Sequence, residues 1–112
     1  MIKLVTCVIK SNAYGHGAVR VAQCLQEQGC RSFAVSCIRE ALELRKAGIE
    51  GEILVMGLAD AYVLADAVRE NLTLTVGSVG DMEAIEREAA RQGKVCKVHI
   101  KVNTGFHRLG FD

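Results

Sequence analysis

A lysine ends the first apolar run of the sequence. Within residues 8–18, VIKSNAYGHGA, Lys10 follows two β-branched residues and leads at once into Asn12, Tyr14 and a glycine-rich segment. Such a lysine is either a solvated loop residue or an amine held at the mouth of a sheet for chemistry. An amine among apolar walls and other cations favours its neutral form, which attacks carbonyl groups. A solvated lysine reaches from a strand end into water, and this segment alone leaves both interpretations open.

A second cationic segment lies near the other end of the sequence. From Cys96 to Val102, the polar residues Lys97, His99 and Lys101 alternate with apolar ones. The period of two predicts a strand with one apolar and one basic face. A solvent-facing edge strand would account for this pattern. In a closed parallel barrel, however, the three polar residues would face the lumen, which would then need water, a counter-charge or a ligand.

Composition limits the classes of function. The sequence has 112 residues, which we treat as a single unit, residues 1–112, forming one domain or part of one. Its formal net charge is +1, so we expect no nucleic-acid partner. The apolar runs are far shorter than the roughly 20 residues of a membrane span, and the N-terminal residues lack the features of a signal peptide. We therefore expect no membrane partner and a cytoplasmic location.

The cysteines predict neither disulfides nor a metal site. They are odd in number and contain no C-x-x-C pair, as the full set shows: Cys7, Cys24, Cys30, Cys37 and Cys96. This pattern is typical of neither a disulfide framework nor a zinc site. We expect reduced thiols that lie mostly in the core, and no bound metal.

The elements that must position these residues alternate along the chain. Strand-like segments cover 3–9, 32–36, 52–57, 72–76 and 94–102. Helical stripes lie between them, beginning near residues 18, 38, 60 and 78 and each expected to run about three turns. Ser78 with Asp81 resembles a capping box, and Gly48 and Gly93 resemble helix stops. Arg45 interrupts the apolar stripe of the second helix.

This order predicts an α/β fold with parallel strands. Each helix is long enough to carry the chain back, so consecutive strands are expected to pair in parallel through right-handed crossovers. Lys10 then lies at the C-terminal end of the first strand. In parallel barrels and open α/β sheets, ligands and catalytic groups gather at that edge.

Two segments carry a resemblance to a known family. VIKSNAYGHGA is similar to the cofactor-lysine segment of the bacterial alanine racemase family, and residues 101–111, KVNTGFHRLGF, resemble a second segment of that family. The resemblance covers essentially the whole chain. It implies the first five strands of an eight-stranded (β/α)8 TIM-type barrel that binds pyridoxal 5′-phosphate, truncated after the fifth strand.

The resemblance assigns roles to individual residues. It makes Lys10 both the lysine that forms the internal aldimine and the catalytic base on one face of the substrate, and it places the hydroxyl of Tyr14 on the cofactor phosphate. Arg108 would bind the cofactor's phenolic oxygen and the carboxylate side of the substrate. Lys101 matches a lysine that is carbamylated in many family members, which would turn a cation into a partner for Arg108. Three further residues would form walls of the cofactor site, although core packing explains them equally well: Val8, Leu54 and Met56.

The resemblance also implies a reaction and its alternatives. The expected function is a fragment of an isomerase that interconverts L- and D-alanine by two-base proton transfer, for D-alanine biosynthesis, within a homodimer. The alternatives are a serine or broad-specificity racemase and a non-catalytic pyridoxal-phosphate carrier. Substrate preference is open because Asn103, Phe106 and His107 depart from the family pattern. We expect these residues alone to be inactive, since the opposite-face base and the arginine facing the pyridine nitrogen belong to family segments outside them.

Overall fold

Five parallel strands in chain order form the centre of the structure. The computed structural model describes residues 4–112. Its strands are β1 (Thr6–Val8), β2 (Ser32–Val35), β3 (Glu52–Leu58), β4 (Thr73–Val76) and β5 (Val98–Ile100). They pair in the order β1-β2-β3-β4-β5, and all four pairings are parallel. The predicted α/β class and parallel pairing are confirmed.

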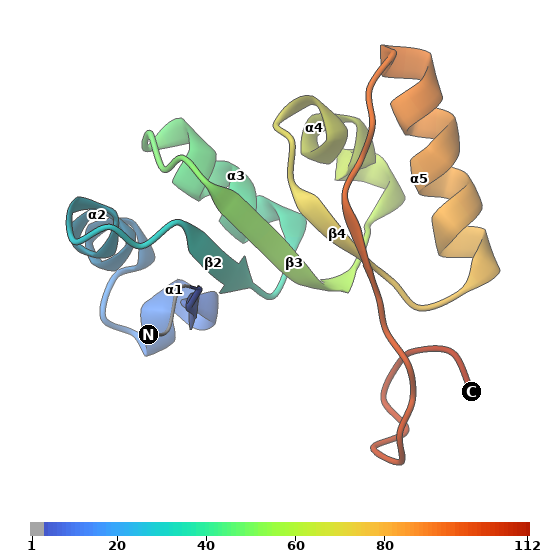
Figure 1. Cartoon of the computed structure of the whole chain (residues 1–112), viewed down its shortest axis with the longest axis horizontal. Helices are drawn as coiled ribbons and strands as arrows, with labels where there is room; N and C mark the ends of the chain where they lie inside the picture. Colours follow the sequence, from blue (N-terminus) through green and yellow to red (C-terminus); the bar gives the residue numbers. More distant parts are fainter. Residues whose placement is uncertain (1–3) are drawn as a thin grey trace.

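Helices line one side of this curved sheet, as Figure 1 shows. They are α2 (Ala18–Glu27), α3 (Ile38–Lys46), α4 (Leu64–Arg69) and α5 (Val79–Gln92), with a 3-10 turn η1 (Ala61–Val63) before α4. Each helix turns an apolar stripe toward the strands, so that Ala22, Ala41 and Ala67 are completely buried. The core therefore lies between the helices and one face of the sheet.

The strand register explains which face is buried. Phe33 pairs with Ile53, and Val55 pairs with Leu74, which in turn pairs with Val98. Phe33, Ile53, Val55 and Leu74 form adjoining rows on the helix side, and all have a relative exposure of 0%. On the opposite face, Val8 keeps 42% of its surface exposed. That second face is the inner side of the curved sheet.

Helix ends follow the predicted signals. The Ser78 hydroxyl accepts a hydrogen bond from the Asp81 N–H at 3.1 Å, and the Asp81 carboxylate accepts one from the Gly77 N–H at 3.0 Å. Gly93 ends α5 with a left-handed backbone at φ 65°, and Gly48 follows α3 with φ 85°. The predicted cap and both stops are confirmed.

Several expectations about the elements are wrong. The first and fifth strands are shorter than predicted, because β1 covers Thr6–Val8 and β5 covers Val98–Ile100. Residue 3 of the first prediction lies outside the described residues. The helix predicted from residue 60 divides into η1 and the six-residue α4, and Ala61 is exposed. No element was predicted between Lys10 and residue 18, but the structure forms α1 (Lys10–Tyr14) there, a turn with left-handed backbone angles from Ser11 onward.

The cysteines are free, as expected, but they do not lie in the core. Cys24 and Cys37 are exposed, and Cys7, Cys30 and Cys96 are half-buried. The three half-buried cysteines pack against the core without being part of it. Within residues 4–112, no helix is long and apolar enough to cross a membrane, and no three His, Cys, Asp or Glu side chains are grouped to hold a metal ion.

The isolated 112-residue chain is expected to associate. β1 and β5 are both edge strands, and Val8, Leu58 and Ile100 keep 42%, 46% and 67% of their surfaces exposed. Unpaired edges beside exposed apolar side chains favour pairing with another chain. Size-exclusion chromatography with light scattering should show concentration-dependent oligomers, and Ile100→Lys should reduce them. A sharp monomer peak at every concentration would contradict this expectation.

Candidate active site

The C-terminal ends of the strands meet in a tightly packed edge. The Gly57 N–H donates to the Ser36 carbonyl at 3.0 Å, and a Cβ added to Gly57 would lie only 2.5 Å from that oxygen. A Cβ on Gly77 would lie 3.2 Å from a Leu58 methyl and 3.3 Å from the Gly110 nitrogen. Glycine therefore lets the end of β3 approach the residue after β2, and lets the residue after β4 approach the end of β3 and the segment after β5.

Lys10 stands at this edge, at the start of α1. It lies two residues after the end of β1 and is half-buried. The next residues, from Ser11 to Tyr14, all have φ between 52° and 55°. The left-handed conformation costs roughly 1–2 kcal/mol for each residue with a side chain, so surrounding contacts must hold it.

Two kinds of contact hold this turn. Ala13 is 4% exposed, and its N–H donates to the Ile9 carbonyl at 3.0 Å. The Asn12 side-chain oxygen accepts from the Ala18 N–H at 2.9 Å, which ties the end of the turn to the start of α2. Tyr14 stays 61% exposed at the end of the turn. The turn therefore presents a phenol at the same edge as the lysine.

The three predicted wall residues share one face of the sheet. Val8 and Leu54 both pair with Ala34, from opposite sides, so they lie in one row. Met56 follows two residues after Leu54 and shares its half-buried state, while Val55 between them is buried against the helices. The sequence therefore identified an apolar row on the inner face, which ends next to Lys10.

The segment after β5 folds back on itself. Val102 and Phe111 form an isolated bridge, and the Phe111 N–H donates to the Lys101 carbonyl at 2.8 Å. The Asn103 side-chain oxygen accepts from the N–H groups of Gly105 and His107, at 3.2 and 3.0 Å. Its amide nitrogen donates to the Asp112 carboxylate at 2.6 Å. An aspartate in place of Asn103 could accept the hydrogen bonds from Gly105 and His107, but it could not donate one to Asp112.

Arg108 and Lys101 lie close together in this segment. Both line a pocket of about 120 Å³, and the Arg108 guanidinium carbon lies 4.9 Å from the centre of the Phe106 ring. A guanidinium over an aromatic face is stabilised by a cation–π interaction. Lys10, by contrast, follows β1, which is the outermost strand on the opposite side of the sheet from β5. Across residues 4–112, the side chains of Lys10, Tyr14 and Arg108 make no hydrogen bond or ion pair.

Two structural residues were not recognised from the sequence. Glu40 accepts hydrogen bonds from the N–H groups of Ser11 and Ser36, at 2.9 and 2.7 Å. Arg45, which interrupts an apolar stripe, donates to the carbonyls of Ile49, Gly51, Glu70 and Asn71 at 2.9 to 3.4 Å. In the sequence, the only indication of this structural role was that the charged Arg45 interrupts the narrow apolar stripe of its helix.

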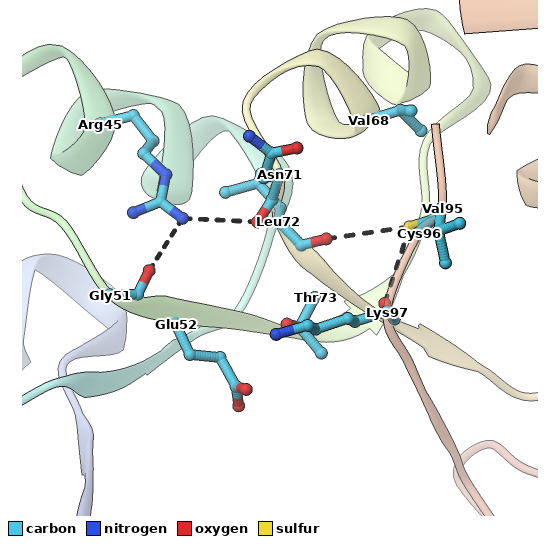
Figure 2. Close-up of a pocket in the computed structure, with 10 residues that line it drawn as sticks. All are labelled: Arg45, Gly51, Glu52, Val68, Asn71, Leu72, Thr73, Val95, Cys96 and Lys97. Carbon is cyan, nitrogen blue, oxygen red and sulfur yellow. Dashed lines mark hydrogen bonds between the residues drawn. The ribbon is translucent and has the colours of Figure 1, made fainter. Parts of the chain in front are cut away.

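Arg45 also lines a large pocket at the opposite end of the sheet, shown in Figure 2. The pocket has a volume of about 470 Å³ and lies where β3 and β4 begin, beside Gly51, Leu72 and Cys96. Its arginine is directed at loop carbonyls in the figure rather than into open space. This pocket lies at the end of the sheet where strands begin, whereas Lys10 lies at the end where strands finish. We therefore do not assign the pocket as the active site, although it is large.

Burial shifts the pKa values of three groups in the structure. Burial raises the pKa of the Cys7 thiol, and its interaction with Cys30, whose sulfur lies 3.4 Å away, adds to the shift. Burial also raises the pKa of Cys96. For Arg45, burial lowers the pKa, while the nearby carboxylates of Glu70 and Glu50 oppose that shift. The two thiols therefore stay protonated near neutral pH and are poor nucleophiles.

Comparison with known proteins gives the family. The model of the family described as "Alanine racemase, N-terminal domain" matches residues 2–112. The chain belongs to the alanine racemase N-terminal domain family. "Alanine racemase" from Pseudomonas syringae is 50% identical over 104 residues, which are 92% of this chain and 28% of that protein. "Alanine racemase 1" from Oceanobacillus iheyensis is 45% identical over 103 residues, 92% of this chain and 27% of that protein.

Solved structures of relatives agree with the fold. An alanine racemase from Clostridium difficile superimposes with a TM-score of 0.94 at 35% identity, over 100% of this chain and 30% of that one. The family's N-terminal domain is the start of a TIM barrel, so the five strands are the first strands of such a barrel, as expected. The chain spans less than a third of the length of these relatives.

Replacing Arg45 should destabilise the fold. Arg45→Met keeps most of the apolar stem but removes the donors to Ile49, Gly51 and Glu70. Because these bonds involve a charged donor at a half-buried site, we expect a loss of about 2 kcal/mol in the free energy of unfolding. Urea unfolding at a fixed protein concentration measures this loss.

Arg39→Met is the matched control for this prediction. Arg39 is exposed on the same helix, so its replacement should change the free energy of unfolding by less than about 0.5 kcal/mol. Equal stability of the two variants would show that the carbonyl contacts of Arg45 contribute nothing.

Proposed function

We propose that this chain is the lysine-bearing part of a pyridoxal-phosphate-dependent amino-acid racemase that interconverts L- and D-alanine. The observation that carries the proposal is Lys10, held at the C-terminal edge of the sheet by a left-handed turn. Family membership and the names of the relatives support it. A cytoplasmic location stays a prediction.

The residues at the edge fit the chemistry of the cofactor. Pyridoxal phosphate presents an aldehyde, a flat ring and a phosphate, which call for an amine, an apolar wall and donors for an anion. Lys10 supplies the amine, and Val8 and Leu54 lie in one apolar row on the inner face. The Tyr14 hydroxyl and the Arg108 guanidinium supply donors that no other described group occupies within residues 4–112.

Different residues of the chain would bind the cofactor, bind the substrate and move the proton. When bound, the cofactor supplies an electron sink that makes the α-hydrogen of an attached amino acid acidic. Lys10 Nζ would hold the cofactor through its aldehyde carbon, and as a free amine it would remove the α-proton from one face in one direction of the reaction and deliver it to that face in the other. Tyr14 would donate to the phosphate, and Arg108 would donate to the phenolic oxygen and the substrate carboxylate. Val8, Leu54 and Met56 would exclude water from the ring.

Inversion needs a second base on the opposite face. One amine can serve one face only, so we propose that the second proton is moved by a tyrosine that a partner subunit supplies in a homodimer. The arginine that faces the pyridine nitrogen would also lie outside these residues. We therefore expect residues 1–112 alone to bind cofactor without racemising alanine.

A different amino acid is the second candidate substrate. A structure titled "Histidine Racemase", from Leuconostoc mesenteroides, superimposes with a TM-score of 0.89 at 33% identity, over 98% of this chain and 30% of that one. The same fold thus carries side-chain preferences beyond alanine. A serine or broad-specificity racemase therefore differs from the first proposal only in its substrate. The names of the relatives favour a racemase over a non-catalytic carrier.

Attachment of pyridoxal phosphate tests the role of Lys10. The full chain should bind the cofactor covalently at Lys10, because Lys10 is half-buried at the strand end while Lys46, Lys97 and Lys101 are exposed. Lys94 is also half-buried, but its amine donates to the Arg69 carbonyl and the Asn71 side chain. Borohydride reduction followed by peptide mass spectrometry should place most of the cofactor on Lys10. Lys10→Ala should abolish the site-specific product, whereas Lys46→Ala should leave it unchanged. Equal labelling of all lysines would refute the assignment.

Lys101 should carry a carbamate in the complete protein. Its amine would attack carbon dioxide and lose a proton, giving an anion beside Arg108, which lines the same pocket. A crystal structure grown with bicarbonate should show the added carboxylate paired with Arg108. Arg108→Met should remove it, and a bare ammonium on Lys101 beside an intact Arg108 would contradict the proposal.

A further inference from the structure

Glu40 bridges two segments that are distant in sequence. One carboxylate oxygen accepts from the Ser11 N–H at 2.9 Å, and the other accepts from the Ser36 N–H at 2.7 Å. Ser11 is the first left-handed residue after Lys10, and Ser36 follows the end of β2. A single side chain thus links the start of the lysine turn to the neighbouring strand.

Only one of these two bonds is explained by α3 itself. Glu40 lies in the first turn of α3, where an acidic side chain commonly accepts from N–H groups at the helix start, and the Ser36 bond is of that kind. The bond to Ser11 reaches back 29 residues and contributes nothing to that helix end. It satisfies an N–H group at the point where the backbone changes to the left-handed region.

Within residues 4–112, Glu40 is the side chain that bonds to the peptide between Lys10 and Ser11, whereas the other contacts of the turn lie further along it. Ala13 is held by burial and by the Ile9 carbonyl, and Asn12 holds the end of the turn against α2. Neither contact fixes the peptide between Lys10 and Ser11. That peptide sets the direction in which the chain, and with it the Lys10 side chain, leaves β1.

We infer that Glu40 is a positioning residue for Lys10, acting through its hydrogen bond to the Ser11 N–H; this inference rests on the proposed function of Lys10. A glutamine at this position has the same shape but only one accepting oxygen, and its NH2 group would face one of the two N–H donors. Glu40→Gln therefore removes one bond with little change in packing.

Amide hydrogen exchange tests the inference without cofactor. In the full chain, Glu40→Gln should speed exchange from Ser11 to Gly15 by about tenfold, the change expected for one lost bond to a charged acceptor. Protection within α3 from Leu42 onward should stay unchanged. Glu43→Gln is the matched control, because Glu43 is exposed on the same helix. Unchanged exchange in the turn, or equal loss throughout α3, would overturn the inference.

Cofactor attachment provides the second readout. The share of reduced pyridoxal phosphate found on Lys10, relative to the other lysines, should fall several-fold in Glu40→Gln and stay at the wild-type level in Glu43→Gln. An equal share in both variants would overturn the inference. If the wild-type chain itself shows no preference for Lys10, the proposed function fails, and the exchange comparison still decides the role of Glu40 in the turn.

Discussion

The parallel pairing of five strands in chain order is the constraint on which the rest of the structure depends. It aligns Phe33 with Ile53 and Val55 with Leu74, and so builds the buried rows against the helices. A slip of one residue in any strand would turn its apolar side chains to the inner face. The same register sets Val8 and Leu54 in one row and brings the ends of all strands to one edge.

The polarity of each strand–helix unit then sorts the charged side chains. Helices end in free carbonyls at the edge where strands begin, and there Arg45 and Lys94 donate to the carbonyls of Glu70 and Arg69. Helices begin with free N–H groups at the edge where strands end, and there Glu40 and Asp81 accept from backbone N–H groups. Cations thus stabilise one edge of the sheet and anions the other.

Hydrophobic periodicity predicted most of the strands and helices, because the burial of an apolar face largely determines where they form. The strands and the four helices follow from apolar residues spaced so that one face can be buried. The Ser78 cap follows from a local pattern of polar residues. The left-handed turn after Lys10 could not be predicted in this way, since none of residues 11–14 is glycine and long-range contacts from Glu40 and Ala13 hold it. The helix predicted from residue 60 was placed too early and made too long, because its apolar spacing begins before Leu64, where the backbone is still a 3-10 turn.

Against this sorting of charges, the cations at the Lys10 edge stand out. Lys10 follows β1, and Lys101 and Arg108 follow β5, so all three lie at the end of the sheet where helices begin and helix N-termini favour negative charge. Cations at this end of the sheet would be stabilised by a bound anion. A phosphate group, a substrate carboxylate and a carbamate on Lys101 are the three anions that the proposed function brings to this edge. The charge pattern therefore supports the same conclusion as the position of Lys10, and it does so independently of the lysine's own chemistry.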